Sequence, residues 1–140
     1  MIFSNSCQYA IKSCIYLAKK NSEKTDVIEI AAYINSPAHF TSKILQKLAK
    51  NTIISSAKGR TGGFYLNDEQ LKTLTIKDVC SAFDGEKILS GCILGLSECN
   101  DNNPCPVHHI GVEIKEKLRS ILTLKISELK DIGSIQFLQE

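Results

Sequence analysis

Three cysteines and one histidine lie close together in a short segment rich in turn-forming residues. Cys92, Cys99, Cys105 and His108 fall in the stretch GCILGLSECNDNNPCPVHH, which glycines and prolines interrupt at four positions. Thiolate sulfur and imidazole nitrogen are the protein ligands of zinc and of iron–sulfur clusters. These residue types in a loop therefore predict a metal centre, and both kinds of centre stay open at this point.

The three remaining cysteines stand in different surroundings. Cys7, Cys14 and Cys80 are flanked by apolar residues at helical spacing, whereas the other half of the six cysteines crowd into one loop. Three disulfides are the alternative for six cysteines, but this clustering and a reducing cytosol both argue against them. We therefore expect Cys14 and Cys80 to be buried structural thiols.

The elements that must hold the loop begin with three helices. Apolar residues recur every three or four positions over residues 4–20, which predicts an opening helix. Asp26 can cap a short helix over 27–34, and a turn at 35–37 leads into a third helix over 38–50. The apolar side of the third helix, which we expect to be core, consists of Phe40, Ile44, Leu45 and Leu48.

A β-ribbon follows the third helix. Residues 53–57 and 64–66 have the composition of short strands, and the glycine-rich segment 58–63 between them is typical of a turn. Three helices and a two-stranded ribbon make a winged helix-turn-helix, which places its second turn-linked helix in the major groove of DNA. The sequence therefore predicts a mainly α-helical protein with a small β-ribbon that binds double-stranded DNA.

Polar residues of the third helix and of the ribbon turn are the candidate DNA contacts. Side chains near the start of a recognition helix reach base edges or the nearby backbone, and lysines further along suit phosphates. In this helix the candidates are His39, Thr41, Ser42, Lys43, Gln46 and Lys47. Lys58 and Arg60 flank Gly59 at the ribbon turn, and such a tip can enter the minor groove.

The C-terminal half is predicted to hold a helix over 76–85 capped by Thr75, the cysteine loop, and a long final helix over about 107–129. No other element is long enough to cover the apolar stripe of the final helix, so we expect a homodimer through it. The stripe consists of Ile110, Ile114, Leu118, Ile121, Leu122 and Leu129. The resulting division is a winged helix-turn-helix at 1–85, a cysteine-rich cluster loop at 86–108, and a dimerisation helix with a tail at 109–140.

Charge is uneven along the chain. Residues 1–70 carry nine Lys and Arg against five Asp and Glu, a net charge of +4, while residues 71–140 carry eight against ten, a net charge of −2. The basic half suits an anionic partner. No apolar run approaches the ~20 residues that cross a bilayer, and the polar N-terminus does not match a signal peptide. We therefore expect no membrane partner and a cytoplasmic location.

These features together resemble the Rrf family of bacterial winged-helix transcription regulators, which has IscR-like and NsrR-like members. The matching segments are YA at 9–10, SPAHFTSKILQKL at 36–48, AKGRTGGFYL at 57–66 and LTIKDVCSAFDG at 74–85. The three-cysteine loop and the long final helix complete the likeness, which spans nearly the whole chain. The resemblance implies a homodimer that binds a palindromic operator. We expect the protein to act as a repressor, although the sequence leaves activation open.

The resemblance also implies an iron–sulfur cluster, which senses redox, nitric oxide or iron–sulfur status. In cluster-binding members three loop cysteines hold the cluster, and they correspond here to Cys92, Cys99 and Cys105. IscR-like members add a histidine three residues after the last cysteine, where this chain has His108. This likeness favours a 2Fe-2S cluster over a 4Fe-4S cluster.

Two departures from the family pattern keep the fourth ligand open. NsrR-like members use an acidic residue of the first helix from the partner subunit, but this chain has Gln8, a poor iron ligand, at that position. Six residues separate Cys92 from Cys99, where relatives usually have four or five. Cys7, next to Gln8, is therefore an alternative fourth ligand. His109 is expected to be an ordinary surface residue.

Two rival functions compete with a cluster-sensing regulator. One is a cluster-free or zinc-binding winged-helix regulator that responds to thiol oxidation or to a small molecule. The other is a redox enzyme or cluster carrier that uses the cysteine loop for chemistry. No CxxC pair and no nucleophile–base pattern supports catalysis, so we expect that the chain is not an enzyme.

Overall fold

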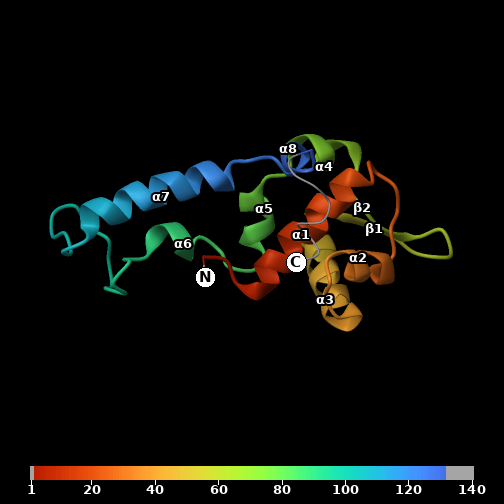
Figure 1. Cartoon of the computed structure of the whole chain (residues 1–140), viewed down its shortest axis with the longest axis horizontal. Helices are drawn as coiled ribbons and strands as arrows, with labels where there is room; N and C mark the ends of the chain where they lie inside the picture. Colours follow the sequence, from red (N-terminus) through yellow and green to blue (C-terminus); the bar gives the residue numbers. More distant parts are fainter. Residues whose placement is uncertain (1, 132–140) are drawn as a thin grey trace.

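The computed structural model, which describes residues 2–131, begins with three helices and a β-hairpin (Figure 1). These elements are α1 (Asn5–Lys19), α2 (Val27–Tyr33), α3 (Ala38–Lys50), β1 (Ser55–Ala57) and β2 (Gly63–Tyr65). The two strands are antiparallel, with Ser55 opposite Tyr65 and Ala57 opposite Gly63. The structure therefore confirms the predicted fold class, a mainly helical chain with a small β-ribbon.

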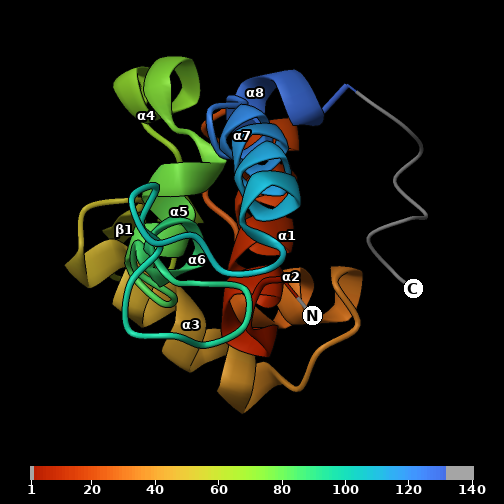
Figure 2. The same cartoon turned by 90° about the vertical axis from the view of Figure 1, so that its left-hand side faces the viewer.

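The rest of the described chain is helical and divides between two regions. Its elements are α4 (Asp68–Thr73), α5 (Ile76–Ser81), α6 (Lys87–Ser90), α7 (His108–Leu122) and α8 (Ile126–Leu129). We call α1–α5, the hairpin and α8 the winged-helix unit, and α6, the loop 91–107 and α7 the arm. In Figure 1 the loop of the arm and the turn of the hairpin lie at opposite ends of the long axis. Figure 2 looks along the arm, with α7 nearly end-on.

Helix α1 is the centre of the winged-helix unit. Leu17 of α1, Ile30 of α2, and Leu45 and Leu48 of α3 have no exposed surface. Removing a leucine or isoleucine side chain from water contributes roughly 1.5–3 kcal/mol, so these contacts fix α3 against the body of the unit. Phe40, at the edge of this core, packs edge-on against Tyr9 with 5.5 Å between ring centroids. The predicted core face of the third helix is confirmed.

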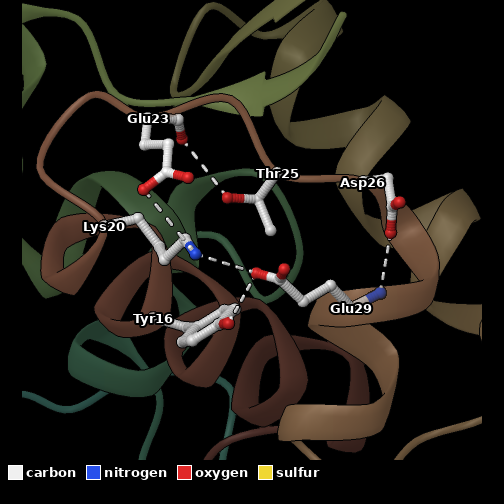
Figure 3. A network of polar contacts seen from close by, with 6 residues as sticks. All are labelled: Tyr16, Lys20, Glu23, Thr25, Asp26 and Glu29. Atoms are coloured by element: carbon white, nitrogen blue, oxygen red, sulfur yellow. Dashed lines mark hydrogen bonds and ion pairs between the residues drawn. The ribbon is translucent and has the colours of Figure 1, made fainter. Parts of the chain in front are cut away.

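A network of polar side chains joins the end of α1 to the start of α2 (Figure 3). The hydroxyl of Tyr16 donates to Glu29 at 2.7 Å, and the ammonium of Lys20 lies 3.2 Å from the same carboxylate. Asp26 caps α2 by accepting from the backbone N–H of Glu29 at 2.8 Å. Tyr33 stacks on Tyr16 with centroids 3.9 Å apart. The network fixes α2, and through the following turn α3, relative to α1.

The hairpin is anchored to the segment that precedes α2. Thr25 and Phe64 exchange two backbone hydrogen bonds of 2.9 Å. Gly63 makes this approach possible, since a Cβ at that position would stand 2.7 Å from the Thr25 carbonyl oxygen. A Cβ on Gly62 would overlap the Ala57 carbonyl. The pair Gly62 and Gly63 therefore permits the tight turn, as the sequence predicted.

Two short helices after the hairpin differ from the sequence prediction. Helix α4 was missed, although Asn67 caps it in a reciprocal capping box with Gln70. Helix α5 begins as predicted behind a Thr75 cap but ends at Ser81, four residues before the predicted end. The backbone N–H groups of Phe83, Asp84 and Gly85 all turn back to the Cys80 carbonyl, and this closes the helix early.

The predicted single helix over 107–129 is wrong, because the chain breaks between α7 and α8. The backbone N–H of Ile76 donates to the Leu124 carbonyl at 3.0 Å, and the N–H of Ile126 donates to the Leu74 carbonyl at 2.8 Å. This pairing draws residues 123–125 out of the helix and buries Ile126 completely. Leu129 of the predicted stripe therefore lies on α8, which packs against α1 and α4. Residues 132–140 of the predicted tail lie outside the described residues.

The apolar stripe of α7 divides between two environments. Leu118 and Leu122 are buried against α5 and α6. Ile110, Ile114 and Ile121 are 63%, 51% and 42% exposed. The helix thus packs on its own chain with one side and presents an uncovered apolar side to the outside. Among the described residues, none of the helices has the length and apolar character needed to span a membrane.

Candidate metal centre and nucleic-acid interface

The four predicted metal ligands are arranged as two pairs in the loop and at the start of α7. The Sγ atoms of Cys92 and Cys105 are 3.8 Å apart, and the Sγ of Cys99 lies 3.5 Å from Nδ1 of His108. His108 is buried as the first residue of α7, while the three cysteines are half-buried. The loop therefore brings each predicted ligand next to one other predicted ligand.

Asp101 completes the surroundings of His108. Its Oδ1 lies 2.6 Å from Nε2 of the imidazole. If Nε2 carries the proton and donates to this carboxylate, the lone pair of Nδ1 faces Cys99. Histidines that bind metals usually donate their second ring nitrogen to a carboxylate or carbonyl, which fixes the tautomer. The imidazole is thus oriented with one nitrogen held and the other turned toward a sulfur.

The backbone of the loop favours a thiolate at Cys92. The N–H groups of Leu96 and then Leu94 bond to its sulfur and lower the pKa of Cys92, with further contributions from Cys105 and the positive charge of Lys115. Lys115 lies on α7 and is 7% exposed. A turn at Gly95, whose φ is 76° and whose N–H donates to the Cys92 carbonyl, gives the loop this path.

The donor set fits a metal centre in chemistry, although the four ligands are not gathered into one cage. Within residues 2–131, no three side chains of His, Cys, Asp or Glu converge tightly enough to hold a metal ion. Three thiols and one oriented imidazole nevertheless match the ligands of zinc and of iron–sulfur clusters. Binding would require the two pairs to close on one another.

The other cysteines and His109 are placed apart from these pairs. Cys14 and Cys80 are buried, as predicted. Cys7 is also fully buried, with its Sγ 2.8 Å from that of Cys80 in the core, which argues against its role as a fourth metal ligand. His109 is exposed beside His108, with their ring centroids 5.6 Å apart.

Helix α3 carries most of its predicted DNA contacts on its open side. The exposed residues are His39, Lys43, Gln46, Lys47 and Lys50, with Ser42 half-buried among them. Gln46 donates to the Ser42 hydroxyl at 3.1 Å, so these two side chains act as one polar unit. Lys47 extends toward the turn that follows α5, with its Nζ 4.8 Å from the centroid of the Phe83 ring.

Thr41 is the exception among the predicted contacts. Its side chain has no exposed surface, and its hydroxyl donates to the Pro37 carbonyl at 3.0 Å. A threonine hydroxyl commonly bonds to the carbonyl four residues earlier in a helix. This placement argues against the prediction that Thr41 contacts DNA, and we give it a structural role instead.

The hairpin turn presents two cations at its tip. Lys58 and Arg60 are exposed on either side of Gly59, whose φ of 100° lies in the region that glycine favours. A basic tip of this kind beside a recognition helix is the geometry of a wing that contacts the backbone or the minor groove.

The fold and these two surfaces define a class, the winged helix-turn-helix proteins that bind DNA. The model of the Rrf2 family, described as an iron-dependent transcriptional regulator, matches residues 3–132. The chain therefore belongs to the Rrf2 family, and this confirms the resemblance seen in its motifs.

Named relatives and solved structures agree with this assignment. A putative HTH-type transcriptional regulator of Aquifex aeolicus (strain VF5) is 33% identical over 138 residues, 97% of this chain and 94% of the relative. The HTH-type transcriptional regulator NsrR of Geobacillus kaustophilus (strain HTA426) is 36% identical over 67 residues, 47% of this chain and 46% of the relative. The structure of CymR, described as the global cysteine regulator of B. subtilis, shares the fold with a TM-score of 0.77 at 20% identity, covering 94% of this chain and 98% of that one. The chain is a transcriptional regulator, not an enzyme.

Proposed function

We propose that this regulator is a cytoplasmic homodimer that binds palindromic operator DNA as a repressor, and that an iron–sulfur cluster on the loop switches its DNA binding. The observation that carries the proposal is the imidazole of His108, buried at the start of α7 with Cys99 on one side and Asp101 on the other. By likeness to IscR-like members, we favour a 2Fe-2S cluster held by Cys92, Cys99, Cys105 and His108.

When bound, the cluster would supply a centre that reacts with oxidants and nitric oxide. Cys92 and Cys105 hold one part of the loop, and Cys99 ties another part to the first turn of α7. Drawing both pairs together would order the loop against α7. Helix α7 packs on α5, and α5 packs on α1. Ordering of the loop would therefore change how the arm is held against the winged-helix unit.

The same helix would relate the two subunits. Ile110, Ile114 and Ile121 leave one side of α7 uncovered, and a second copy of α7 would cover it. The order of the loop would then set the separation of the two α3 helices, which must match the half-site spacing of the operator. Equal affinity of the iron-loaded and iron-free forms for every operator would exclude this switch.

The cluster is tested by purification without oxygen, followed by an absorption spectrum and by iron and sulfide analysis. We expect a coloured protein with equal amounts of iron and sulfide, and loss of both in Cys92→Ser and His108→Ala. His109→Ala is the matched control, because His109 is adjacent but exposed. Protein that stays colourless after reconstitution would remove the cluster from the proposal.

DNA binding is tested by selection from a random duplex library, which should enrich an inverted repeat. Arg60→Ala should then weaken binding and reduce the slope of log affinity against log salt by about 0.9, the share of one phosphate contact. Lys72→Ala on α4 is the control, since Lys72 is an exposed cation that belongs neither to α3 nor to the hairpin turn. An unchanged slope for Arg60→Ala would rule out that contact.

A second candidate is a cluster-free regulator that responds to thiol oxidation, or one that binds zinc. The observation that favours it is the 3.8 Å approach of Cys92 to Cys105, two thiols that can join without the other ligands. Colourless protein containing one zinc ion per chain would support the zinc form. Colourless, metal-free protein whose DNA affinity changes when Cys92 and Cys105 are oxidised would support the thiol form.

A further inference from the structure

Two cysteines outside the loop lie in contact across the core of the winged-helix unit. The Sγ atoms of Cys7 on α1 and Cys80 on α5 are 2.8 Å apart, although the residues are 73 positions apart in sequence. Both side chains are buried, at 0% and 2% exposure. The S–S bond of a disulfide is about 2.05 Å, so a small approach of the two sulfurs would bring them to bonding distance.

Cys14 shows that burial alone does not explain this contact. It lies two turns further along α1 and is equally buried, but the thiol–thiol hydrogen bond joins Cys7 to Cys80 and leaves Cys14 out. Burial raises the pKa of Cys14 to about 12. The hydrogen bond donated by Cys7 has the opposite effect on its partner, since it lowers the pKa of Cys80. Cys80 is thus the better nucleophile of the three.

A small cavity leads to Cys80 from the side of the arm. It measures about 40 Å³ and lies between α5, α6 and α7, with Cys80, Ser81, Leu89 and Leu122 among its lining residues. A single water needs roughly 10–15 Å³ of such space. A molecule the size of hydrogen peroxide therefore has room in the cavity that Cys80 lines.

We propose that Cys7 and Cys80 form a redox modification site, in which hydrogen peroxide joins them in a disulfide that ties α1 to α5. The Cys80 thiolate attacks one oxygen of the peroxide and becomes a sulfenic acid, while the other oxygen leaves as hydroxide and takes up a proton to form water. The Cys7 sulfur then attacks the Cys80 sulfur. The S–S bond forms, and the sulfenic hydroxyl leaves as a second water with the proton of Cys7. The two thiols lose two electrons and the peroxide gains them.

The disulfide would fix α1 against α5 next to the segment that leads into α6 of the arm. The backbone N–H of Ser4 already donates to Asp84 at 2.9 Å, one residue before Gly85 and just ahead of α6. A covalent link between α1 and α5 would hold the two helices together and so favour this contact until the disulfide is reduced. The site goes beyond the proposed function, because it needs neither the loop cysteines nor a metal.

The test treats the folded full-length chain with hydrogen peroxide, blocks free thiols under denaturing conditions, and maps disulfides by mass spectrometry. Cys92, Cys99 and Cys105 are replaced by serine to prevent exchange with the loop, and the unsubstituted chain is mapped in parallel. We expect loss of two of the three core thiols, a linked peptide pair containing Cys7 and Cys80, and recovery of both thiols with a reductant. Cys14→Ala should leave this result unchanged, and Cys7→Ala should abolish it.

Three free core thiols after peroxide treatment would overturn the proposal, as would a link between Cys14 and Cys80. Oxidation in urea provides the comparison for unfolded chains, since all three pairings should appear there. A native sample with the same mixture of pairings would also overturn it, because the folded geometry would then select nothing. The mapping on the chain with all three core cysteines does not depend on any core variant folding.

Discussion

The winged-helix unit and the arm differ in how much of their apolar side-chain surface they bury. The unit closes its apolar residues around α1, and Leu17, Ile30, Leu45 and Leu48 have no contact with solvent. In the arm, large apolar residues remain exposed at Ile93, Leu94, Leu96, Ile110, Ile114 and Ile121. Exposed apolar residues gathered in one region mark an interaction surface. The unit therefore buries most of its apolar residues within one chain, whereas the arm is shaped for contacts beyond it.

The largest expected effect comes from opening the closed core. Leu45→Ala should lower the free energy of unfolding by about 2–5 kcal/mol, because it leaves a cavity in a fully buried site. Leu94→Ala, the same change in the exposed loop of the arm, should alter it by less than about 0.5 kcal/mol. Urea denaturation measures both variants. Equal losses would break the distinction between the two regions.

The next largest effect is expected on homodimerisation, from a substitution on the uncovered side of α7. Ile114→Asp should weaken homodimerisation at least ~10-fold, or about 1.4 kcal/mol, since it places a charge in an apolar contact. Val112→Asp is the matched control, because Val112 is exposed on the opposite side of the helix from Ile114. Sedimentation equilibrium separates the two variants. Unchanged dimerisation of Ile114→Asp would place the interface elsewhere.

Helix α4 tests whether a solvent-exposed element of the unit also contributes to its stability. Asn67→Ala removes the side chain that accepts from the Gln70 backbone N–H at 2.8 Å, and should cost about 1 kcal/mol. Thr73→Ala, at the other end of α4, lacks a capping role and should have a smaller effect. Thermal unfolding followed by circular dichroism compares them. An Asn67 variant no weaker than the Thr73 variant would show that the cap is unimportant.

The smallest effect concerns the polar network of Figure 3 and depends on pH. The hydrogen bond from Tyr16, followed by that from Lys20, lowers the pKa of Glu29. A lowered carboxyl pKa stabilises the fold above the ordinary value near 4.3, and this contribution is lost as pH falls through the folded-state pKa. Because the carboxylate is half-exposed, Glu29→Gln should cost only about 0.5 kcal/mol at pH 7. The difference from the unsubstituted chain should shrink below pH 4, and a difference that grows instead would refute the assignment.

The sequence correctly predicted those helices whose position depends on the periodicity of neighbouring apolar residues. The periodicity of residues 4–20 and 38–50 gave α1 and α3 within a residue or so, because their apolar faces are continuous. Helix α4 has no buried residue and so no stripe, and only its capping pair, Asn67 and Gln70, could have revealed it. The break after α7 was not predictable in this way. It arises from backbone pairing between residues 74–76 and 124–126, which are distant in sequence.

The same distinction between local pattern and distant contact applies to the candidate sites. Residue types and spacing identified the loop ligands, but their pairing as Cys92 with Cys105 and Cys99 with His108 depends on the path of the loop. Thr41 belonged to the polar start of α3 in sequence, yet its hydroxyl turns inward to Pro37. The contact of Cys7 with Cys80 joins two separate helices, so no sequence spacing could signal it.

The backbone pairing at Thr75 and Lys125 joins the two ends of a segment that contains α5 and the arm. For a segment of about 50 residues, the entropic cost of holding its two ends together grows only with the logarithm of its length. Doubling the length costs about 0.6 kcal/mol of free energy. Inserting one residue therefore costs only about 0.02 kcal/mol. Variation in the spacing between Cys92 and Cys99 is thus nearly free for the DNA-binding unit. Evolution could tune the chemistry of the loop while the fold that reads DNA stayed the same.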